Sequence, residues 1–468
     1  MFSPRSPPLP TKRDDRPRPP SVDRVLAAVR PRLEVPRDPT ALRAAAREIV
    51  DAERRRLEGE GGPAGSADAL AAAIVARLES WVSHEPTWVI NATGVIVHTN
   101  LGRAPWAEHA AEAIDAATDY LLLEIDRETG RRGRRLRLAE EHLIALTGAE
   151  DALVTNNNAA AMALAVGLAG RGGIVVSRGE LVEIGGGVRI PDIVRRAGAR
   201  LIEVGTTNRT RAEDFEAPLA EGKARAVLRV HPSNFTIAGF TEAPDPAAVA
   251  ALAHRHGAIV IDDLGSGALL DTAAYGLAHE PLPGERLKAG SDVVTFSGDK
   301  LVGGPQAGLV VGRADLIARM RRDPLARAMR PDKVTLLGVA RTLGLYRAGL
   351  AADQVPVWVM IAASLEGLKA RAGSLAARLG ADRAEIVELR STVGGGSLPG
   401  ETLPSWGIAL SAASSASADR LLARLRRGEP IVIARVADGR VVLDLRTVDP
   451  EMDESLAEAI GRAISPGR

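Results

Sequence analysis

Ser291–Gly312 has the sequence SDVVTFSGDKLVGGPQAGLVVG, in which two short apolar runs flank a glycine-rich segment that carries Lys300. This pattern predicts a strand, an exposed turn and a second strand, with the lysine at the tip of the turn. Only six of the 60 basic residues are lysines. Because arginine cannot give up its proton and form an imine, a lysine retained among glycines is a candidate Schiff-base amine. The simpler alternative is a surface lysine in an ordinary connection between strands.

The composition indicates a globular protein with a substantial core. The chain has 468 residues, of which 46% are hydrophobic, and this length predicts two or three domains. Its 60 basic and 59 acidic residues nearly cancel, so a nucleic-acid site would have to be a local patch. The absence of cysteine excludes disulfides, cysteine-based zinc sites and thiol nucleophiles. The chain shows no signal peptide and no apolar run long enough to span a membrane, so we expect a cytoplasmic protein that does not bind a membrane. We also expect no metal site.

The middle of the chain alternates short apolar runs with segments of helical length, such as Ala159–Leu168, Ile190–Ala197 and Pro246–His256. This alternation predicts an α/β fold with a mostly parallel, doubly wound sheet. In such sheets ligands bind at the carboxyl ends of the strands, so the residues that follow each strand are the candidates for chemistry. The six expected strands are Ala152–Thr155, Gly173–Ser177, Arg200–Val204, Ala226–Val230, Ala258–Ile261 and Val293–Phe296.

Two regions precede this sheet. Residues 1–20 contain seven prolines and several basic residues, and we expect a disordered tail there. Residues 21–88 have helical spacing on both sides of a flexible break at Gly59–Gly65, which predicts a small helical N-terminal domain. The sheet domain should then occupy residues 89–340.

Residues 341–468 predict a long helical stretch followed by a small α/β C-terminal domain. Its clearest feature is a pair of apolar runs, Pro430–Arg435 and Val441–Leu445, around an Asp438–Gly439 turn, which predicts a hairpin. Gly394–Ser397 has the glycine content of a phosphate-binding loop. Because no helix start follows it, we interpret it as an ordinary loop.

Three features at strand ends point to one kind of site. Asn156–Ala161 begins a helix with small residues, which suits a phosphate, although an ordinary capped helix explains it equally well. Asp262 and Asp263 end a strand, where a carboxylate could keep a heterocyclic nitrogen protonated; a Mg²⁺ site or a simple strand-end cap are the alternatives. Phosphate turn, carboxylate and then Lys300 is the order expected of a pyridoxal-phosphate site.

Arginine is concentrated in two segments. Arg127–Arg137 holds six arginines and Arg319–Arg330 holds five. Solvated surfaces explain most such runs, but arginines near a phosphate cofactor could also bind an anionic co-substrate or a nucleic-acid backbone. Arg103 lies in a loop rich in Asn, Thr and Gly and is a further candidate. His98 and His231, at strand ends, are candidates for acid–base groups or for structural hydrogen bonds.

Eight stretches over roughly residues 80–345 carry a family resemblance. The stretches are Asn91–Arg103 (NATGVIVHTNLGR), Asn156–Ala161 (NNNAAA), Ser177–Pro191 (SRGELVEIGGGVRIP), Glu203–Thr210 (EVGTTNRT), Val230–Phe235 (VHPSNF), Asp263–Ala268 (DLGSGA), Phe296–Gly308 (FSGDKLVGGPQAG) and Asp323–Lys333 (DPLARAMRPDK). In this order they resemble bacterial L-seryl-tRNA(Sec) selenium transferase, the selenocysteine synthase.

The resemblance implies a fold-type-I pyridoxal-phosphate enzyme in which Lys300 is the Schiff-base lysine. Asp263, which stands directly before LGSG, becomes the expected partner of the pyridine nitrogen in preference to Asp262. Asp299 is a catalytic candidate that either tunes the lysine amine or shapes the turn. The phosphate of the cofactor should be held by Asn157, Asn158, Ala159 and Ser297.

The resemblance also implies the partners. Arg103, Arg327 and Arg330 match arginines expected to bind selenophosphate, and the helical N-terminal domain should bind seryl-tRNA(Sec). The subunits should form a homodecamer, a pentamer of dimers. The implied reaction converts L-seryl-tRNA(Sec) to L-selenocysteinyl-tRNA(Sec) through dehydroalanyl-tRNA. The alternatives are a related pyridoxal-phosphate lyase acting on a small amino acid or an amino-sugar phosphate, and a tRNA-binding scaffold without catalysis.

Overall fold

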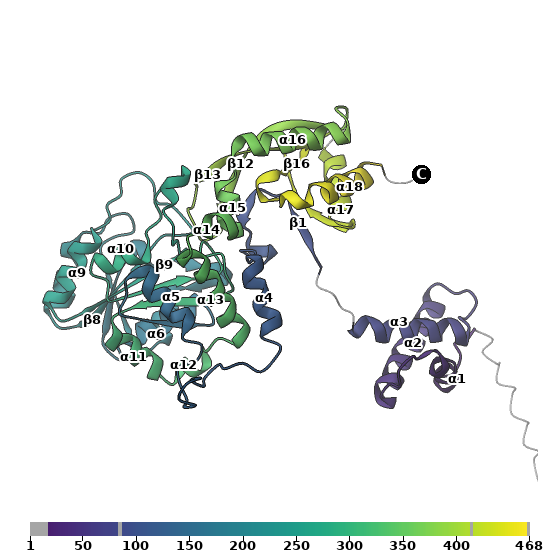
Figure 1. Ribbon diagram of the computed structural model, residues 1–468, viewed down its shortest axis with the longest axis horizontal. Coiled ribbons are helices and arrows are strands. Elements are labelled where there is room, and N and C mark those ends of the chain that lie inside the picture. The colour runs from purple at the N-terminus through teal and green to yellow at the C-terminus, as the bar shows by residue number, and fades with distance from the viewer. Residues whose placement is uncertain (1–16, 83–86, 412–414, 466–468) are drawn as a thin grey trace, which may run out of the picture. The chain divides into compact units, whose positions relative to one another are not determined.

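The computed structural model describes residues 17–82, 87–411 and 415–465, and the chain divides into two compact units, residues 1–88 and residues 89–468 (Figure 1). Most of the expected disordered tail therefore lies outside the described residues. In the described part, no helix is long and apolar enough to cross a membrane.

The first unit contains three helices, α1 (Val22–Val29), α2 (Pro39–Gly59) and α3 (Ala67–Val82). Asp38 caps α2, because its carboxylate accepts hydrogen bonds from two backbone N–H groups of the first turn. The predicted break separates α2 from α3. Alanines and branched side chains at helical spacing form the core between the three helices.

The second unit is built on a seven-stranded sheet with the order β3-β11-β10-β9-β8-β4-β7. All six predicted strands are present, and every strand except β11 runs in the same direction. The parallel α/β sheet predicted from the sequence is therefore confirmed. The strands are β3 (Asp151–Thr155), β4 (Gly173–Ser177), β7 (Arg200–Val204), β8 (Ala224–Val230), β9 (Ile259–Gly265), β10 (Val293–Ser297) and β11 (Gly308–Gly312).

Helices cover both faces of this sheet, as the nearly continuous burial of its central strands requires. One face packs on α6 (Asn158–Gly167), α7 (Ile190–Arg196) and α11 (Ala314–Arg322). The other face packs on two groups of helices. These are α8 (Glu216–Ala220) with α9 (Pro246–Arg255), and α5 (Leu138–Thr147) with α13 (Lys333–Arg347) and α15 (Pro356–Ala362).

A second sheet has the order β15-β16-β13-β12-β2. Its strand β2 (Val95–Val97) comes from the start of this unit and pairs with the far end of β12, while β1 (Val89–Asn91) pairs with β14. The loop after β2 is thereby anchored on residues almost 300 positions later in the chain. The other strands are β12 (Ala384–Gly394), β13 (Thr402–Leu410), β14 (Ile431–Ile433), β15 (Arg435–Ala437) and β16 (Arg440–Asp444).

The predicted hairpin is present as β15 and β16, with Asp438 and Gly439 at its turn in left-handed conformations, φ 51° and φ 71°. The first predicted run was too long, because Ile431–Ile433 pairs with β1 instead of continuing the hairpin. Three helices complete this region: α16 (Leu365–Leu379), α17 (Ser415–Arg427) and α18 (Asp453–Ile464).

Candidate active site

Lys300 lies in the turn between β10 and β11, and most of this turn is buried, with Lys300 itself partly exposed. Asp299 is 6% exposed, and Leu301 and Val302 are inaccessible or nearly so. The Tyr346 hydroxyl of α13 lies 3.0 and 2.9 Å from the carbonyl oxygens of Leu301 and Val302. The prediction of an exposed turn was therefore wrong. The helices that cover the turn come after it in the sequence, so the local pattern held no sign of them.

Two glycines approach the Lys300 amine closely. A Cβ atom on Gly396, whose φ is +82°, would lie 2.5 Å from Nζ, so any larger residue there would displace the amine. A Cβ atom on Gly265 would lie 3.9 Å from the same nitrogen. Gly396 belongs to Gly394–Ser397, which forms a loop as predicted. Its position against the lysine could not be predicted, because it depends on the second sheet.

The buried environment changes the acid–base behaviour of Lys300. Burial lowers the pKa of the Lys300 ammonium, and the nearby charge of Arg103 lowers it further, while the carboxylates of Asp263, Asp299 and Glu280 act in the opposite direction. The net shift is downward. Lys300 can therefore exist as a free amine at lower pH than an ordinary lysine, as a nucleophile or a general base requires.

Asp263 lies near the carboxyl end of β9, where Lys300 is one of its charged neighbours. Its Oδ1 accepts hydrogen bonds from Asn158 Nδ2 at 2.8 Å and Thr295 Oγ1 at 2.9 Å, and no hydrogen bond to Oδ2 is found among the described residues. Burial raises the pKa of Asp263 despite these two donors. Asp262 alternates to the opposite side of the strand, near Ser291 and Arg286.

The start of α6 lies beside these two groups. Asn157 is the N-cap, and its side chain accepts from Ala160 N at 2.9 Å, so the ordinary cap considered as an alternative is present. Asn158 uses its side chain on Asp263. The first N–H groups of a helix have no partner within the helix, which leaves those of Asn158 and Ala159 available to a phosphate. Ser297 pairs with Gly308, whose backbone lies against Asn157.

Asp299 and Arg103 form an ion pair, with Arg103 Nη1 2.7 Å from Asp299 Oδ2. Arg103 has a left-handed backbone at φ 69°, and Ala104 N donates to the Asp299 carbonyl at 3.3 Å. The loop after β2 is thus fixed next to the lysine. The structure places Arg103 at the carboxylate beside Lys300.

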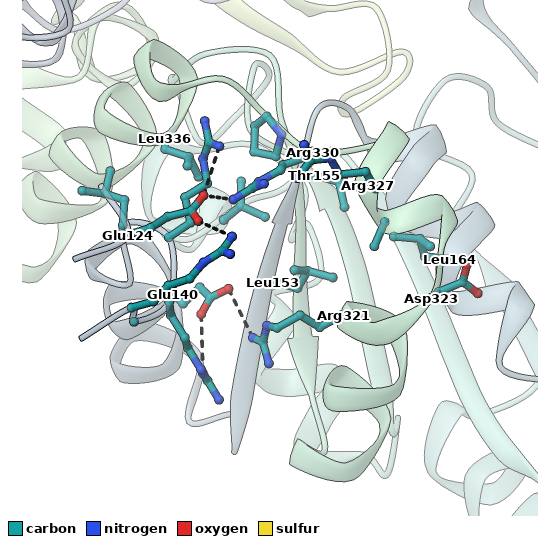
Figure 2. Close-up of a pocket in the computed structure, with 18 residues that line it drawn as sticks. Glu124, Glu140, Leu153, Thr155, Leu164, Arg321, Asp323, Arg327, Arg330 and Leu336 are labelled. Atoms are coloured by element: carbon teal, nitrogen blue, oxygen red, sulfur yellow. Dashed lines mark hydrogen bonds and ion pairs between the residues drawn. The ribbon is translucent and has the colours of Figure 1, made fainter. Parts of the chain in front are cut away.

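Arg327 and Arg330 line a cavity of about 340 Å³ (Figure 2). Glu124 binds Arg330 and also lies 2.8 Å from Arg132, whereas the exposed Arg327 has no ion pair among the described residues. Asn156 N donates to the Met329 carbonyl at 2.9 Å, which ties this segment to the start of α6. Arg103 does not line the cavity, so the three candidate arginines do not converge on one point within this chain.

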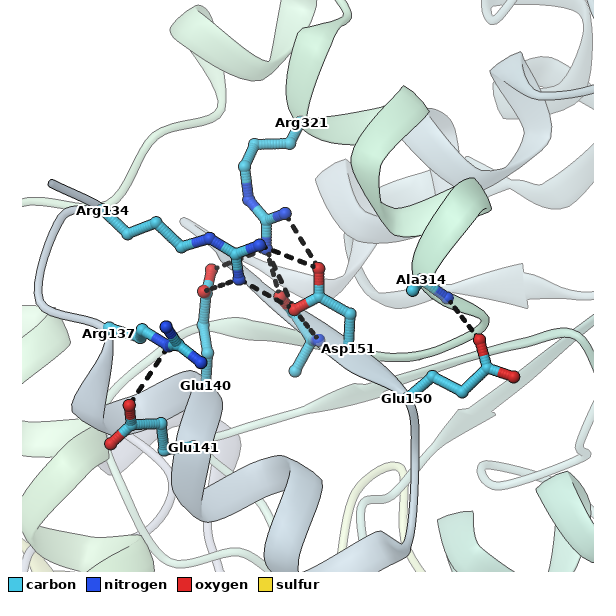
Figure 3. A network of polar contacts seen from close by, with 9 residues as sticks. Arg134, Arg137, Glu140, Glu141, Glu150, Asp151, Ala314 and Arg321 are labelled. Atoms are coloured by element: carbon cyan, nitrogen blue, oxygen red, sulfur yellow. Dashed lines mark hydrogen bonds and ion pairs between the residues drawn. The ribbon is translucent and has the colours of Figure 1, made fainter.

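A second cluster of ion pairs includes three residues that line the cavity, Arg134, Glu140 and Arg321 (Figure 3). Arg321 lies 3.0 Å from Asp151 and 3.2 Å from Glu140, and Arg134 reaches the same two carboxylates at 3.0 and 3.5 Å. Both carboxylates are buried. These arginines are consequently neutralised within the chain and serve its structure.

The sequence did not predict Glu280, which is close enough to Lys300 to raise its pKa, and it left the role of His98 undecided. Glu280 is 2% exposed, accepts from the buried Ser266 hydroxyl and lies 3.2 Å from His231 Nε2. Glu280 stands in an irregular segment with no sequence signal. His98 Nδ1 is buried and has no hydrogen-bond partner in the part of the chain that the structure describes.

Comparison with known proteins assigns the chain. Residues 89–449 match the family model for L-seryl-tRNA selenium transferase. The chain belongs to this family. The L-seryl-tRNA(Sec) selenium transferase of Rhizobium meliloti is 42% identical over 95% of this chain and 98% of the relative. That of Moorella thermoacetica is 46% identical over 80% of this chain and 81% of the relative. These matches confirm the resemblance found in the sequence.

A solved structure shows the same fold. The D-glucosaminate-6-phosphate ammonia-lyase structure superposes with a TM-score of 0.57, at 21% identity, over 82% of this chain and 97% of the lyase. A likeness at this identity concerns the fold alone, and it confirms the predicted fold-type-I architecture. The alternative activity as a small-molecule lyase gains no support from it.

Pyridoxal 5'-phosphate, the cofactor predicted from the sequence, follows from the family assignment. The residues of this chain fit it. Lys300 offers an amine, and the start of α6 offers backbone N–H groups. Asp263 Oδ2 accepts no hydrogen bond from any described residue. Two further buried polar atoms in this region, Asn158 Oδ1 and Ser397 Oγ, also have no hydrogen-bond partner among the described residues.

Proposed function

We propose that this chain is a pyridoxal-phosphate-dependent selenium transferase that converts L-seryl-tRNA(Sec) to L-selenocysteinyl-tRNA(Sec) with selenophosphate as selenium donor. The observation that carries the proposal is the buried amine of Lys300, with its lowered pKa, opposite the strand-end carboxylate Asp263. The match to the Rhizobium meliloti enzyme over 95% of the chain supports the substrate.

The residues that would hold the cofactor surround Lys300. The N–H groups of Asn158 and Ala159, with the Ser297 hydroxyl, would bind its phosphate, while Asn157 keeps the helix start in place. Asp263 would pair with its ring nitrogen through Oδ2 and so keep that nitrogen protonated. When bound, the cofactor supplies an electron sink for negative charge that develops at the substrate Cα.

Lys300 then acts as the base. Its free amine takes the proton from the seryl Cα, and the hydroxyl leaves from Cβ as hydroxide or, once protonated, as water. Selenium from selenophosphate then forms the new bond at the same Cβ while Lys300 returns a proton to Cα, and cleavage of the selenium–phosphorus bond by water releases phosphate. Asp299 is proposed to adjust the Lys300 pKa while its carboxylate is held by Arg103.

Among the described residues the exposed Arg327 has no ion pair, and it is proposed as the main selenophosphate ligand. Arg330, which lines the same cavity, would join it by exchanging Glu124 for the donor's phosphate. Arg103 lies outside this cavity, and we propose that it contacts the donor beside Lys300 by exchanging its bond to Asp299. The helical N-terminal unit is proposed to bind the tRNA. We further propose a homodecamer, a pentamer of dimers, working in the cytoplasm.

A single-turnover assay tests the function. Purified enzyme with cofactor is mixed with seryl-tRNA(Sec) and selenophosphate, and the aminoacyl group is released and identified by mass. Selenocysteine is expected from seryl-tRNA(Sec), with much less from ordinary seryl-tRNA. No selenocysteine, together with ammonia release from an amino-sugar phosphate, would support the lyase alternative instead.

A further inference from the structure

An open groove of about 560 Å³ lies between α17 and α18 in the C-terminal part of the second unit. Four arginines and one carboxylate, Glu429, line it. Alanines of both helices form its apolar floor, so nothing bulky fills the space between the charged groups. The lining residues are Arg420, Ala423, Arg424, Arg427, Gly428, Glu429, Ala459, Arg462 and Ala463.

Three of these arginines share one face of α17. Arg420, Arg424 and Arg427 are separated by four and three residues, the spacing of neighbours on a helix surface. All three are exposed, while Leu421 and Leu425 on the opposite side are buried in the core. Among the described residues, no ion pair or side-chain hydrogen bond involves any of the three.

The fourth arginine comes from the neighbouring helix. Arg462 donates to the Glu429 carbonyl at the rim and lies 3.6 Å from Glu458. Basic residues in a last helical turn often serve only to offset the helix dipole, which explains Arg424 and Arg427 equally well. Arg420 stands about two turns before the end of α17, and the dipole does not explain why it and Arg462 border the same groove.

In the cavity lined by Arg327 and Arg330, Arg321 and Arg330 both contact carboxylates of this chain, so their charge is already used. In the groove, Arg420, Arg424 and Arg427 have no ion pair among the described residues, whereas Arg462 lies near Glu458. From Arg420 to Arg427 the helix rises about 10 Å, which is too far for one small anion and suits a row of phosphates.

We propose that this arginine groove, defined by Arg420, Arg424, Arg427 and Arg462, binds the phosphate backbone of the tRNA substrate. The inference rests on the proposed function, because that function supplies the RNA partner. The groove adds sequence-independent affinity, and its contribution falls as salt rises because bound counterions are released. Arg462 would exchange its bond to the Glu429 carbonyl for a phosphate.

The test is tRNA binding by the full chain with its cofactor, measured by fluorescence anisotropy with uncharged tRNA(Sec) from about 50 to 200 mM KCl. The triple variant Arg420→Gln, Arg424→Gln, Arg427→Gln is expected to bind about tenfold more weakly at low salt. Its slope of log affinity against log salt should be smaller by about 2. The corresponding triple lysine variant keeps the charge and should bind within about threefold of wild type.

A matched control removes the same charge elsewhere in this unit. Arg171, Arg196 and Arg225 are exposed and, among the described residues, have no ion pair, so replacing all three with glutamine should change neither affinity nor slope. Equal loss in this control would overturn the inference, because net charge alone would then explain the effect. Loss in the lysine variant as large as in the glutamine variant would overturn it as well.

The remaining outcomes separate the groove from the catalytic proposal. If the glutamine variant binds tRNA with wild-type affinity and slope, the groove proposal fails while conversion of seryl-tRNA stands. If wild-type enzyme binds tRNA through the groove but forms no selenocysteine, only the catalytic proposal fails. A wild-type chain that binds no tRNA would contradict both.

Discussion

The Lys300 turn and the arginine-lined cavity each place a cation among carboxylates, but the pKa of the cation shifts in opposite directions in the two regions. At Lys300 burial prevails and the ammonium pKa is lowered despite three nearby carboxylates. At Arg321 burial also acts against the charge, yet the bond to Asp151 and the charge of Glu140 prevail and raise the guanidinium pKa. A lysine can give up its proton in such a place, whereas an arginine cannot. Chemistry is therefore expected at the lysine and fixed charge at the arginines.

The carboxylates do not divide between the two regions in this way. Burial raises the pKa of Asp263 and, because it outweighs the two arginines, the pKa of Glu140. Asp151 is also buried, but its hydrogen bonds to Arg321, Ala152 and Arg134 lower its pKa. Within the described residues Asp263 forms no ion pair, as expected of a group that would pair with a protonated ring nitrogen.

Removing the lysine should have the largest effect. Lys300→Ala is expected to lower selenocysteine formation by more than about 10³-fold and to abolish the visible absorption band of the bound cofactor, because both the imine and the base are lost. Lys223→Ala, an exposed lysine paired with Glu221, is the matched control and should keep both. Wild-type turnover by Lys300→Ala would contradict the assignment.

Asp263→Asn should have the second largest effect on activity. The amide keeps the bonds to Asn158 and Thr295 possible but cannot hold a ring nitrogen protonated, so kcat should fall by about 10²-fold while tRNA binding is unchanged. Asp262→Asn is the neighbouring control, since that side chain faces the other side of the strand. A larger loss of kcat from Asp262→Asn than from Asp263→Asn would exchange the two roles.

In the cavity, the arginines should separate into structural and ligand-binding ones. Arg321→Ala leaves Asp151 and Glu140 with Arg134 alone and should lower the free energy of unfolding by about 3 kcal/mol, measured by urea denaturation. Arg327→Ala breaks no ion pair within the described residues. It should leave stability unchanged and raise the KM for selenophosphate about tenfold. If Arg321→Ala and Arg327→Ala lowered the free energy of unfolding equally, the arginines could not be separated into structural and ligand-binding ones.

The smallest effects concern the pKa of Lys300. Its charged form is disfavoured in the folded enzyme, so the rate of cofactor uptake by cofactor-free enzyme should rise with pH and level off below the ordinary lysine pKa. Asp299→Asn removes a charge that raises this pKa and should move the profile to lower pH. Arg103→Gln removes a charge that lowers it and should move the profile to higher pH. If both variants moved the profile in the same direction, the ion pair would affect Lys300 by holding the loop in place and not through its two charges.

The sequence predicted those parts of the site that depend on neighbouring residues in the chain. The strand before Lys300, the strand-end Asp263 and the helix start at Asn157 are local patterns, and all are present where expected. Gly396 and Glu280 lie near the lysine because of packing between distant parts of the chain, which local sequence patterns do not predict. The burial of the turn has the same cause, because α13 and α15 cover it from later positions.

The most direct test of the central claim identifies the lysine that binds the cofactor. The enzyme with pyridoxal phosphate is reduced with borohydride, digested, and mapped by mass spectrometry across all six lysines. We predict one modified peptide, carrying the reduced cofactor on Lys300. Modification of another lysine, with Lys300 unmodified, would contradict the account.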